Sequence, residues 1–295
     1  MKKRNKLLAL LLVTVLAFSA GACGSSDTDK KSSTTQENQD IKPAELLSAS
    51  QGKLKDVSSM NAKMIMDMDM DISAEGESQS MQSVSTIDMS CFYDPLRFKI
   101  DMTMDAGELG TTSTTMYAET DDNGTCTMYM TDGTNWQSQE IDLNDLTQYN
   151  ASSNMSEYMQ ESYQYESAGT EEVNGVKAYK LTGKVTGDNI KDAMLSSGAL
   201  NSLSSLGIDS TQAESMMDGI SDIPITLWID ADSQFPVKYE IEMTDAMNTL
   251  MSNIMKSVEG AEGASINITK MNMSMTCSDY NKAAEFSVPA EAKEA

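Results

Sequence analysis

Residues 62–72 read AKMIMDMDMDI, and this stretch decides the fold. Met64, Met66, Met68, Met70 and Ile72 occupy one parity, and Asp67, Asp69 and Asp71 occupy the other. Alternation with a period of two is typical of a β-strand that has one apolar face and one solvated face. The stretch therefore predicts a strand of a sheet that is apolar on one side.

The same alternation returns further along the chain. It places Phe98, Ile100, Met102 and Met104 on one parity, then Cys126, Met128 and Met130, then Ile266, Ile268, Met271, Met273 and Met275. The last series changes parity near Lys270, which predicts a β-bulge. Turn sequences such as Asn174-Gly175 separate the segments and favour antiparallel hairpins. With further strands expected over residues 176–187 and 223–244, the count reaches nine or ten. That number predicts a strongly curled sheet or a half-open β-barrel.

Amphipathic helices are expected between the strands. Residues 42–59 carry Pro43 in a first-turn position followed by an apolar stripe, residues 188–219 predict two short helices, and residues 245–258 predict a third helix capped by Asp245. Residues 144–164 are ambiguous, with a short helix expected around Met155. Helices that cover or plug the concave side of a mainly antiparallel sheet give an α+β class and a single domain over residues 43–290.

The first 42 residues do not belong to that domain. A basic start is followed by an apolar run over residues 7–18 and by small residues before Cys23, which is the order of a cleavable export signal over residues 1–22. The Cys23-Gly24-Ser25 sequence resembles a bacterial lipobox, although Ala20 stands where Leu is usual. We expect lipid on Cys23, a disordered tether over residues 23–42, and a location on the outer face of the cytoplasmic membrane. The alternative is a soluble secreted protein.

Composition narrows the partners and the chemistry. The chain has 21 basic and 45 acidic residues, and loss of four basic residues with the signal would leave 17 − 45 = −28. This balance argues against nucleic acid and against electrostatic docking on anionic lipid. The chain contains no histidine and no recognisable catalytic motif, so we expect neither an enzyme nor a metal site nor a cofactor. Cys91, Cys126 and Cys277 lie in expected strands as buried thiols, with one disulfide as the open alternative.

The 25 methionines allow three interpretations. Thioethers bind copper(I), but these methionines are spread over several strands rather than gathered at one point. They can fill an ordinary core, or they can line an adaptable pocket for lipid tails. On parity alone, with Trp228 added, the candidate ligand-binding residues are Met64, Met66, Met68, Met70, Met102, Met104, Met128, Met130 and Trp228.

Three segments resemble a known superfamily: residues 46–72, the hairpin EEVNGVKAYKLTGKV over 171–185, and ITLWIDADSQFPVKYEIEM over 225–243. They are similar to the superfamily of the lipoprotein-localisation carrier and the mycobacterial lipid-binding lipoproteins, and most similar to Met-rich lipoproteins of Gram-positive bacteria. The resemblance implies a half-barrel with an apolar cavity for acyl chains. It does not carry over the carrier's task of delivering lipoproteins to an outer membrane.

Two functions therefore stand beside each other. The first is a membrane-anchored lipoprotein that binds a lipid or other amphiphile in an apolar concave cavity. The second is a non-catalytic structural, sensor or interaction lipoprotein of the cell envelope, with a packed interior and no ligand. A hollow apolar face favours the first, and a filled one favours the second. Protein partners stay unknown at this stage.

Overall fold

The computed structural model describes residues 42–74, 77–121, 124–142, 150–190, 215–257 and 263–295. The expected signal peptide, nearly all of the expected tether and Cys23 lie outside these residues. Most of the expected helical pair over 188–219 lies outside them as well. In the described part of the chain, no helix has the length and apolarity needed to cross a membrane.

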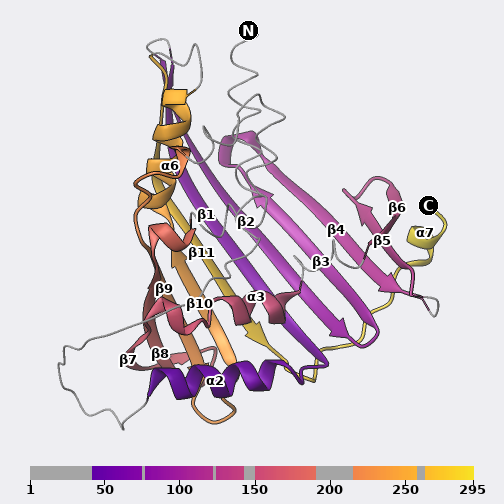
Figure 1. The fold of residues 1–295 in the computed structure, drawn as a ribbon. Coiled ribbons are helices and arrows are strands. Elements are labelled where there is room, and N and C mark those ends of the chain that lie inside the picture. Colours follow the sequence, from indigo (N-terminus) through magenta and orange to yellow (C-terminus); the bar gives the residue numbers. More distant parts are fainter. Residues whose placement is uncertain (1–41, 75–76, 122–123, 143–149, 191–214, 258–262) are drawn as a thin grey trace.

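Eleven antiparallel strands form one sheet in the order β6-β5-β4-β3-β2-β1-β11-β10-β9-β8-β7 (Figure 1). The strands are β1 (Ser59–Ala74), β2 (Glu77–Tyr93), β3 (Leu96–Asp105), β4 (Thr111–Thr120), β5 (Cys126–Thr131), β6 (Trp136–Ile141), β7 (Glu166–Val173), β8 (Val176–Val185), β9 (Ile223–Asp230), β10 (Pro236–Glu242) and β11 (Ser265–Ser278). Since β6 and β7 are the two ends of this order, the sheet is not closed. The predicted antiparallel α+β class is confirmed. The count exceeds the prediction of nine or ten strands, and the edge strands β6 and β7 are polar and carry little apolar alternation.

The first and last strands pair at the centre of the sheet. Met64 of β1 lies opposite Met275 of β11, and Met66 lies opposite Met273. The register shifts between Asp69, which pairs with Lys270, and Met70. The bulge predicted near Lys270 is therefore confirmed, and it keeps the apolar residues of both strands on one face despite the change of parity.

The helices are α2 (Pro43–Leu54), α3 (Ala151–Glu157), α6 (Thr244–Ser257) and α7 (Ala290–Lys293), with 3₁₀ turns η2 (Gly107–Leu109) and η4 (Glu161–Tyr163). Pro43 occupies the first turn of α2, as predicted. The predicted end at residue 59 is wrong, because the chain leaves the helix after Leu54 and enters β1 at Ser59. Helix α6 begins at Thr244, so Asp245 lies inside the first turn and is not the cap.

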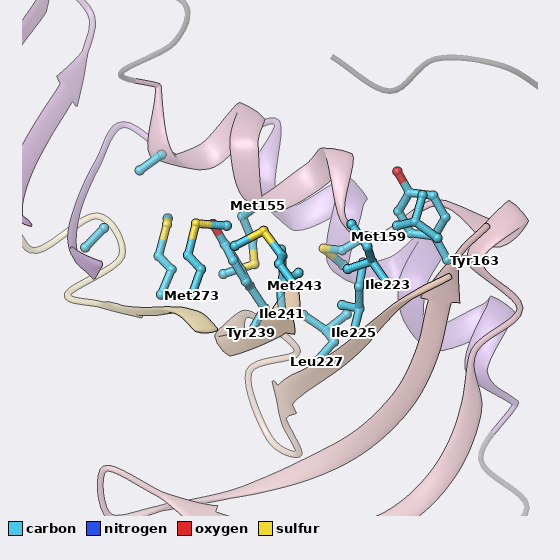
Figure 2. Packing of buried hydrophobic residues seen from close by; sticks show 14 of the residues in the cluster. Met155, Met159, Tyr163, Ile223, Ile225, Leu227, Tyr239, Ile241, Met243 and Met273 are labelled. Carbon is cyan, nitrogen blue, oxygen red and sulfur yellow. The ribbon is translucent and has the colours of Figure 1, made fainter. Parts of the chain in front are cut away.

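The main core lies between one face of the sheet and α2, α3 and α6. Helix α6 packs along β11, where the Asn248 side chain donates to the Ile268 carbonyl (2.6 Å) and accepts from the Ile268 amide (2.7 Å). Helix α3 is held against α2 by Gln51, whose Nε2 donates to the Met159 carbonyl at 3.2 Å. Figure 2 shows Met155 and Met159 packed over Ile225, Leu227 and Tyr239.

The C-terminal segment crosses the opposite face of the sheet. Phe286 packs against Phe92 and Tyr117, with ring centroids 5.7 and 5.9 Å apart, and Arg97 pairs with Glu285. Ala292 of α7 is fully buried. The packed structure therefore continues beyond residue 290, where the sequence placed the end of the domain.

Candidate ligand-binding face

The face of the sheet that turns toward the core, called here the inward face, carries almost no charge over β1–β6. Directly opposed residues share a face, so the register defines continuous rows across the strands. One row runs through Met66, Ser85 and Met104, and its neighbour runs through Met64, Ile87 and Met102. Among the paired residues of β1–β6 that the structure describes, Glu77 at the β1–β2 turn is the one inward residue with a charge. The other charges of these strands occupy the outward face.

Burial falls along this inward face. Met60 and Met275 are fully buried, whereas Met104 and Met130 are 40% and 36% exposed. Met102 and Met128 are half-buried. Met104 pairs with Ser85 and Thr112 whereas Met130 pairs with Met116, so the two exposed methionines lie in different rows of this face. The arrangement suits contact with an apolar molecule.

We call the less buried part of the inward face the open face. It consists of Met64, Met66, Met68, Met102, Met104, Met128 and Met130, with Ser83, Ser85, Thr112 and Thr114 between them. All eight methionines predicted from parity point inward and are thus brought together, although Met70 is buried in the core and lies outside the open face. The serines and threonines were missed. The alternation of residues 81–91, with Met81, Ile87 and Met89 on one parity, would have placed the two serines inward.

The other half of the inward face is filled by side chains. Met155 and Met159 are fully buried over β9 and β10, and the Tyr158 and Tyr239 rings lie 4.7 Å apart. Gly183 of β8 lets η4 approach the sheet closely, since a Cβ there would lie 2.7 Å from the Tyr163 carbonyl oxygen. The short helix near Met155 that the sequence left ambiguous is thus a plug over β8–β10.

Trp228 is not part of the methionine face. It belongs to a separate small cluster with Val173, Ala178 and Val237 on the outward side of the sheet. Lys180 and Lys238 place their Nζ atoms 5.1 and 4.7 Å from the centroid of the indole, and Nε1 donates to Glu171 at 3.2 Å. The structure therefore gives Trp228 a packing role on the far face, where it cannot touch a ligand on the methionines.

The outward face holds a polar depression of about 380 Å³ over β1, β2 and β3. Lys63 pairs with Asp88 at 3.1 Å, and Lys99 pairs with Asp101 at 2.7 Å, so its charges cancel locally. The hydrogen bond to Asp101 raises the pKa of Lys99. Asp67, from the aspartate series of β1, is paired with Lys270 on the same face. These carboxylates behave as the solvated side of a strand.

The three thiols of the described chain are buried, and none of them forms a disulfide. Burial raises the pKa of Cys91 to about 11 and that of Cys277 to about 12, which removes the thiolate needed for nucleophilic chemistry. Cys91 on β2 and Cys277 on β11 flank β1, so their Cα atoms are roughly 9.5 Å apart or more, too far for a disulfide. Cys126 lies on β5, further away. The disulfide alternative is thus not realised.

Metal binding has no support in the described residues, where no group of three or more histidine, cysteine, aspartate or glutamate side chains converges. The methionine sulfurs of the open face are distributed along rows on several strands rather than gathered around one point. The site therefore offers an extended apolar surface with scattered hydroxyl groups.

Comparison with solved structures returns a lipoprotein and other proteins at low sequence identity. The Mycobacterium tuberculosis lipoprotein LppX is 13% identical with a TM-score of 0.42, and the match covers 83% of this chain and 98% of that one. LprF from Mycobacterium bovis is 13% identical with a TM-score of 0.46 and coverage of 85% and 97%. A LolA-superfamily protein from Nitrosomonas europaea is 11% identical with a TM-score of 0.19 and coverage of 84% and 96%.

No curated protein matches the sequence. One family model does, described as a family of unknown function, DUF6612, and it matches residues 42–295. That span begins where α2 begins and includes every strand of the sheet and the C-terminal segment. The chain belongs to the DUF6612 family.

Proposed function

We propose that this protein is a lipid-anchored extracytoplasmic lipoprotein that binds a lipid or other amphiphile on its open face. The observation that carries the proposal is the gradient of burial along one uncharged face, from Met60 at 0% to Met104 at 40% exposure. Acyl chains would cover the exposed methionines and remove their apolar surface from water. The anchor on Cys23 and the export signal belong to the same proposal.

Methionine suits this role better than the β-branched residues that strands usually favour. Its side chain is unbranched and polarizable, so it adapts to tails of different shape. Met104 and Met130 are too exposed to be explained by packing within the chain. A role in an adaptable apolar lining would account for methionine at these two positions.

The second candidate is an interaction protein that holds no ligand. It is favoured by the plug over β8–β10, where Met155 and Met159 leave no exposed surface. Under this hypothesis the exposed methionines would contact a protein partner. The two hypotheses differ in whether lipid accompanies the purified chain.

The test is native mass spectrometry combined with lipid extraction, on the chain exported into its own envelope with an ordinary cleavable secretion signal in place of residues 1–22 and with Cys23→Ser in place of the acylated residue. We expect stoichiometric lipid on this protein. Met102→Asp, which puts a charge on the open face, should reduce the bound lipid at least about tenfold, because an unpaired charge resists contact with acyl chains.

Thr103→Asp is the matched control. Thr103 is the next residue on β3, exposed on the outward face opposite Thr86 and Ser113, so a charge there should leave the lipid in place. A lipid-free protein, together with no uptake of a fluorescent diacylglycerol, would favour the interaction protein. Equal loss of lipid in both variants would argue against the open face as the site.

A further inference from the structure

We propose that the open face selects lipids with an uncharged headgroup and discriminates against anionic ones, an inference that rests on the proposed function. Across β1–β6 the described inward positions hold apolar and neutral polar residues, with Glu77 at the start of β2 as the one charged exception. An anionic group placed among them would find no cation. Burying an ion without a partner is strongly unfavourable.

The lysines of these strands cannot supply that cation. Lys63 of β1 and Lys99 of β3 project from the opposite side of the sheet. Lys63 is paired there with Asp88, directly opposite on β2, and Lys99 with Asp101 of its own strand. Arg97 is likewise outward, between the Phe92 and Phe286 rings. The strand parity that makes the inward face apolar therefore also removes every basic side chain of β1–β6 from it.

The end of the sheet nearest the exposed methionines is acidic. The β1–β2 and β3–β4 turns lie at the same end of the sheet (Figure 1), and they carry Glu77, Asp105 and Glu108. Leu109, 68% exposed, stands beside Glu108 in the second of these turns. A headgroup that emerges at this end meets carboxylates, so an anion is repelled there as well as along the face. The formal net charge of −24 adds to the repulsion at long range.

Neutral polar groups do have partners on the open face. Ser85 lies between Met66 and Met104, and Thr114 lies beside Met102. Their hydroxyl groups can donate and accept hydrogen bonds without a change in charge. A lipid whose headgroup carries hydroxyl and ester oxygens, such as a diacylglycerol, matches this mixture of apolar surface and isolated hydroxyls.

The experiment compares two competitors that share the same acyl chains. The chain with Cys23→Ser and without its signal is loaded with a fluorescent diacylglycerol, which is then displaced by dioctanoylglycerol or by dioctanoyl phosphatidylglycerol. We expect dioctanoylglycerol to displace the probe at a concentration at least about tenfold lower than that needed of dioctanoyl phosphatidylglycerol. Equal potency, or a more potent anionic competitor, would overturn the selectivity. Failure of the fluorescent diacylglycerol to bind at all would instead overturn the proposed function, and this inference with it.

A pair of variants on β2 tests the cause of the selectivity. Ser85→Lys puts a cation on the open face between two methionines, and Thr86→Lys puts one on the outward face opposite Ile65 and Thr103. The first should bring the potency of phosphatidylglycerol close to that of dioctanoylglycerol, and the second should change neither. If both variants raise the anionic potency alike, the discrimination comes from net charge and not from the open face. Should Ser85→Lys fail to fold, the comparison with the unaltered chain still decides.

Discussion

At the residue scale, the buried thiols make the free energy of unfolding fall as the pH rises through the alkaline range. Burial raises the pKa of Cys91 to about 11 and that of Cys277 to about 12, from an ordinary 9.0. Unfolding lets each thiol ionise near pH 9, so the stability from keeping them neutral is complete below that pH and is lost as pH rises toward 11 to 12. We expect the free energy of unfolding to fall by roughly 1 kcal/mol per thiol between pH 8 and 10.

Urea unfolding at a series of pH values checks this expectation. Cys277→Ala should be less stable at pH 7 because of its cavity, yet show a shallower decline above pH 9. Tyrosines of the unfolded chain ionise near pH 10, and burial raises the folded-state pKa of Tyr239 and Tyr280, so they add a decline of their own as the pH approaches 10. Both proteins share that decline, and the difference between their slopes belongs to the thiol. The same alkaline slope in both proteins would contradict the assignment.

Residue parity predicted much of the methionine face and failed at Trp228. On β1, β3 and β5 one parity is apolar and the other polar, so facing direction can be read directly from the sequence. On β9 both parities are apolar, because Ile225, Leu227 and Ile229 face the core while Trp228 is covered on the far side by Lys180 and Lys238. Alternation carries no directional information in such a strand.

At the element scale, the plug over β8–β10 depends on one glycine. A Cβ on Gly183 would lie 2.7 Å from the Tyr163 carbonyl oxygen and 2.8 Å from Cδ1 of Tyr165. Gly183→Ala should therefore push η4 away from β8 and lower the free energy of unfolding by about 1–3 kcal/mol.

Gly52→Ala provides the matched control with the opposite sign. Gly52 lies within α2, and nothing stands within 4 Å of where its Cβ would be. Alanine there should raise stability by about 0.5–1 kcal/mol, because glycine loses more backbone entropy in a helix. Chemical denaturation of both variants measures the difference. A Gly183→Ala protein as stable as the parent would show that η4 can move away from β8 without lowering the free energy of unfolding.

Strands were easier to predict than helices. The strand series came from an alternation that burial on one face imposes, and even the bulge at Lys270 left a parity change in the sequence. Helix α3 left a weaker signal, enough to expect a short helix around Met155 but not its bounds. It has seven residues and is held by contacts such as Gln51 with the Met159 carbonyl and Ser152 with the Leu54 carbonyl. Those partners lie about a hundred residues away in the chain, beyond the reach of local patterns.

At the scale of the whole molecule, the proposed anchor leads into α2 at the edge of the packed domain. Cys23→Ala should move the protein from the washed membrane fraction to the medium or to an unprocessed precursor, because diacylation at Cys23 provides two acyl chains. Cys91→Ala, which alters a buried thiol, should leave it on the membrane. Immunoblots of the two fractions measure this, and a Cys23→Ala protein with the same fractionation and the same mature size as Cys91→Ala would argue against lipid on Cys23.

The openness of the sheet was only partly predictable. The number and alternation of the strands suit a curled sheet and a closed barrel equally. What leaves the sheet open is that β6 and β7, at opposite ends of the strand order, do not pair. Neither strand has an apolar alternation that would mark it as an edge or as a partner of the other.

The pairing of β1 with β11 has a consequence for the order in which the molecule is made. Strands β1–β6 and β7–β11 are two runs of neighbouring hairpins, each of which can assemble from nearby sequence. The seam that joins them needs residues 265–278, among the last to emerge. Until β11 forms, β1 has an unpaired edge. This strand is rich in methionine, and its free backbone groups can pair with another chain. A chain in which β11 has not yet formed is thus vulnerable to aggregation, and a truncation that removes β11 should leave it permanently in that condition.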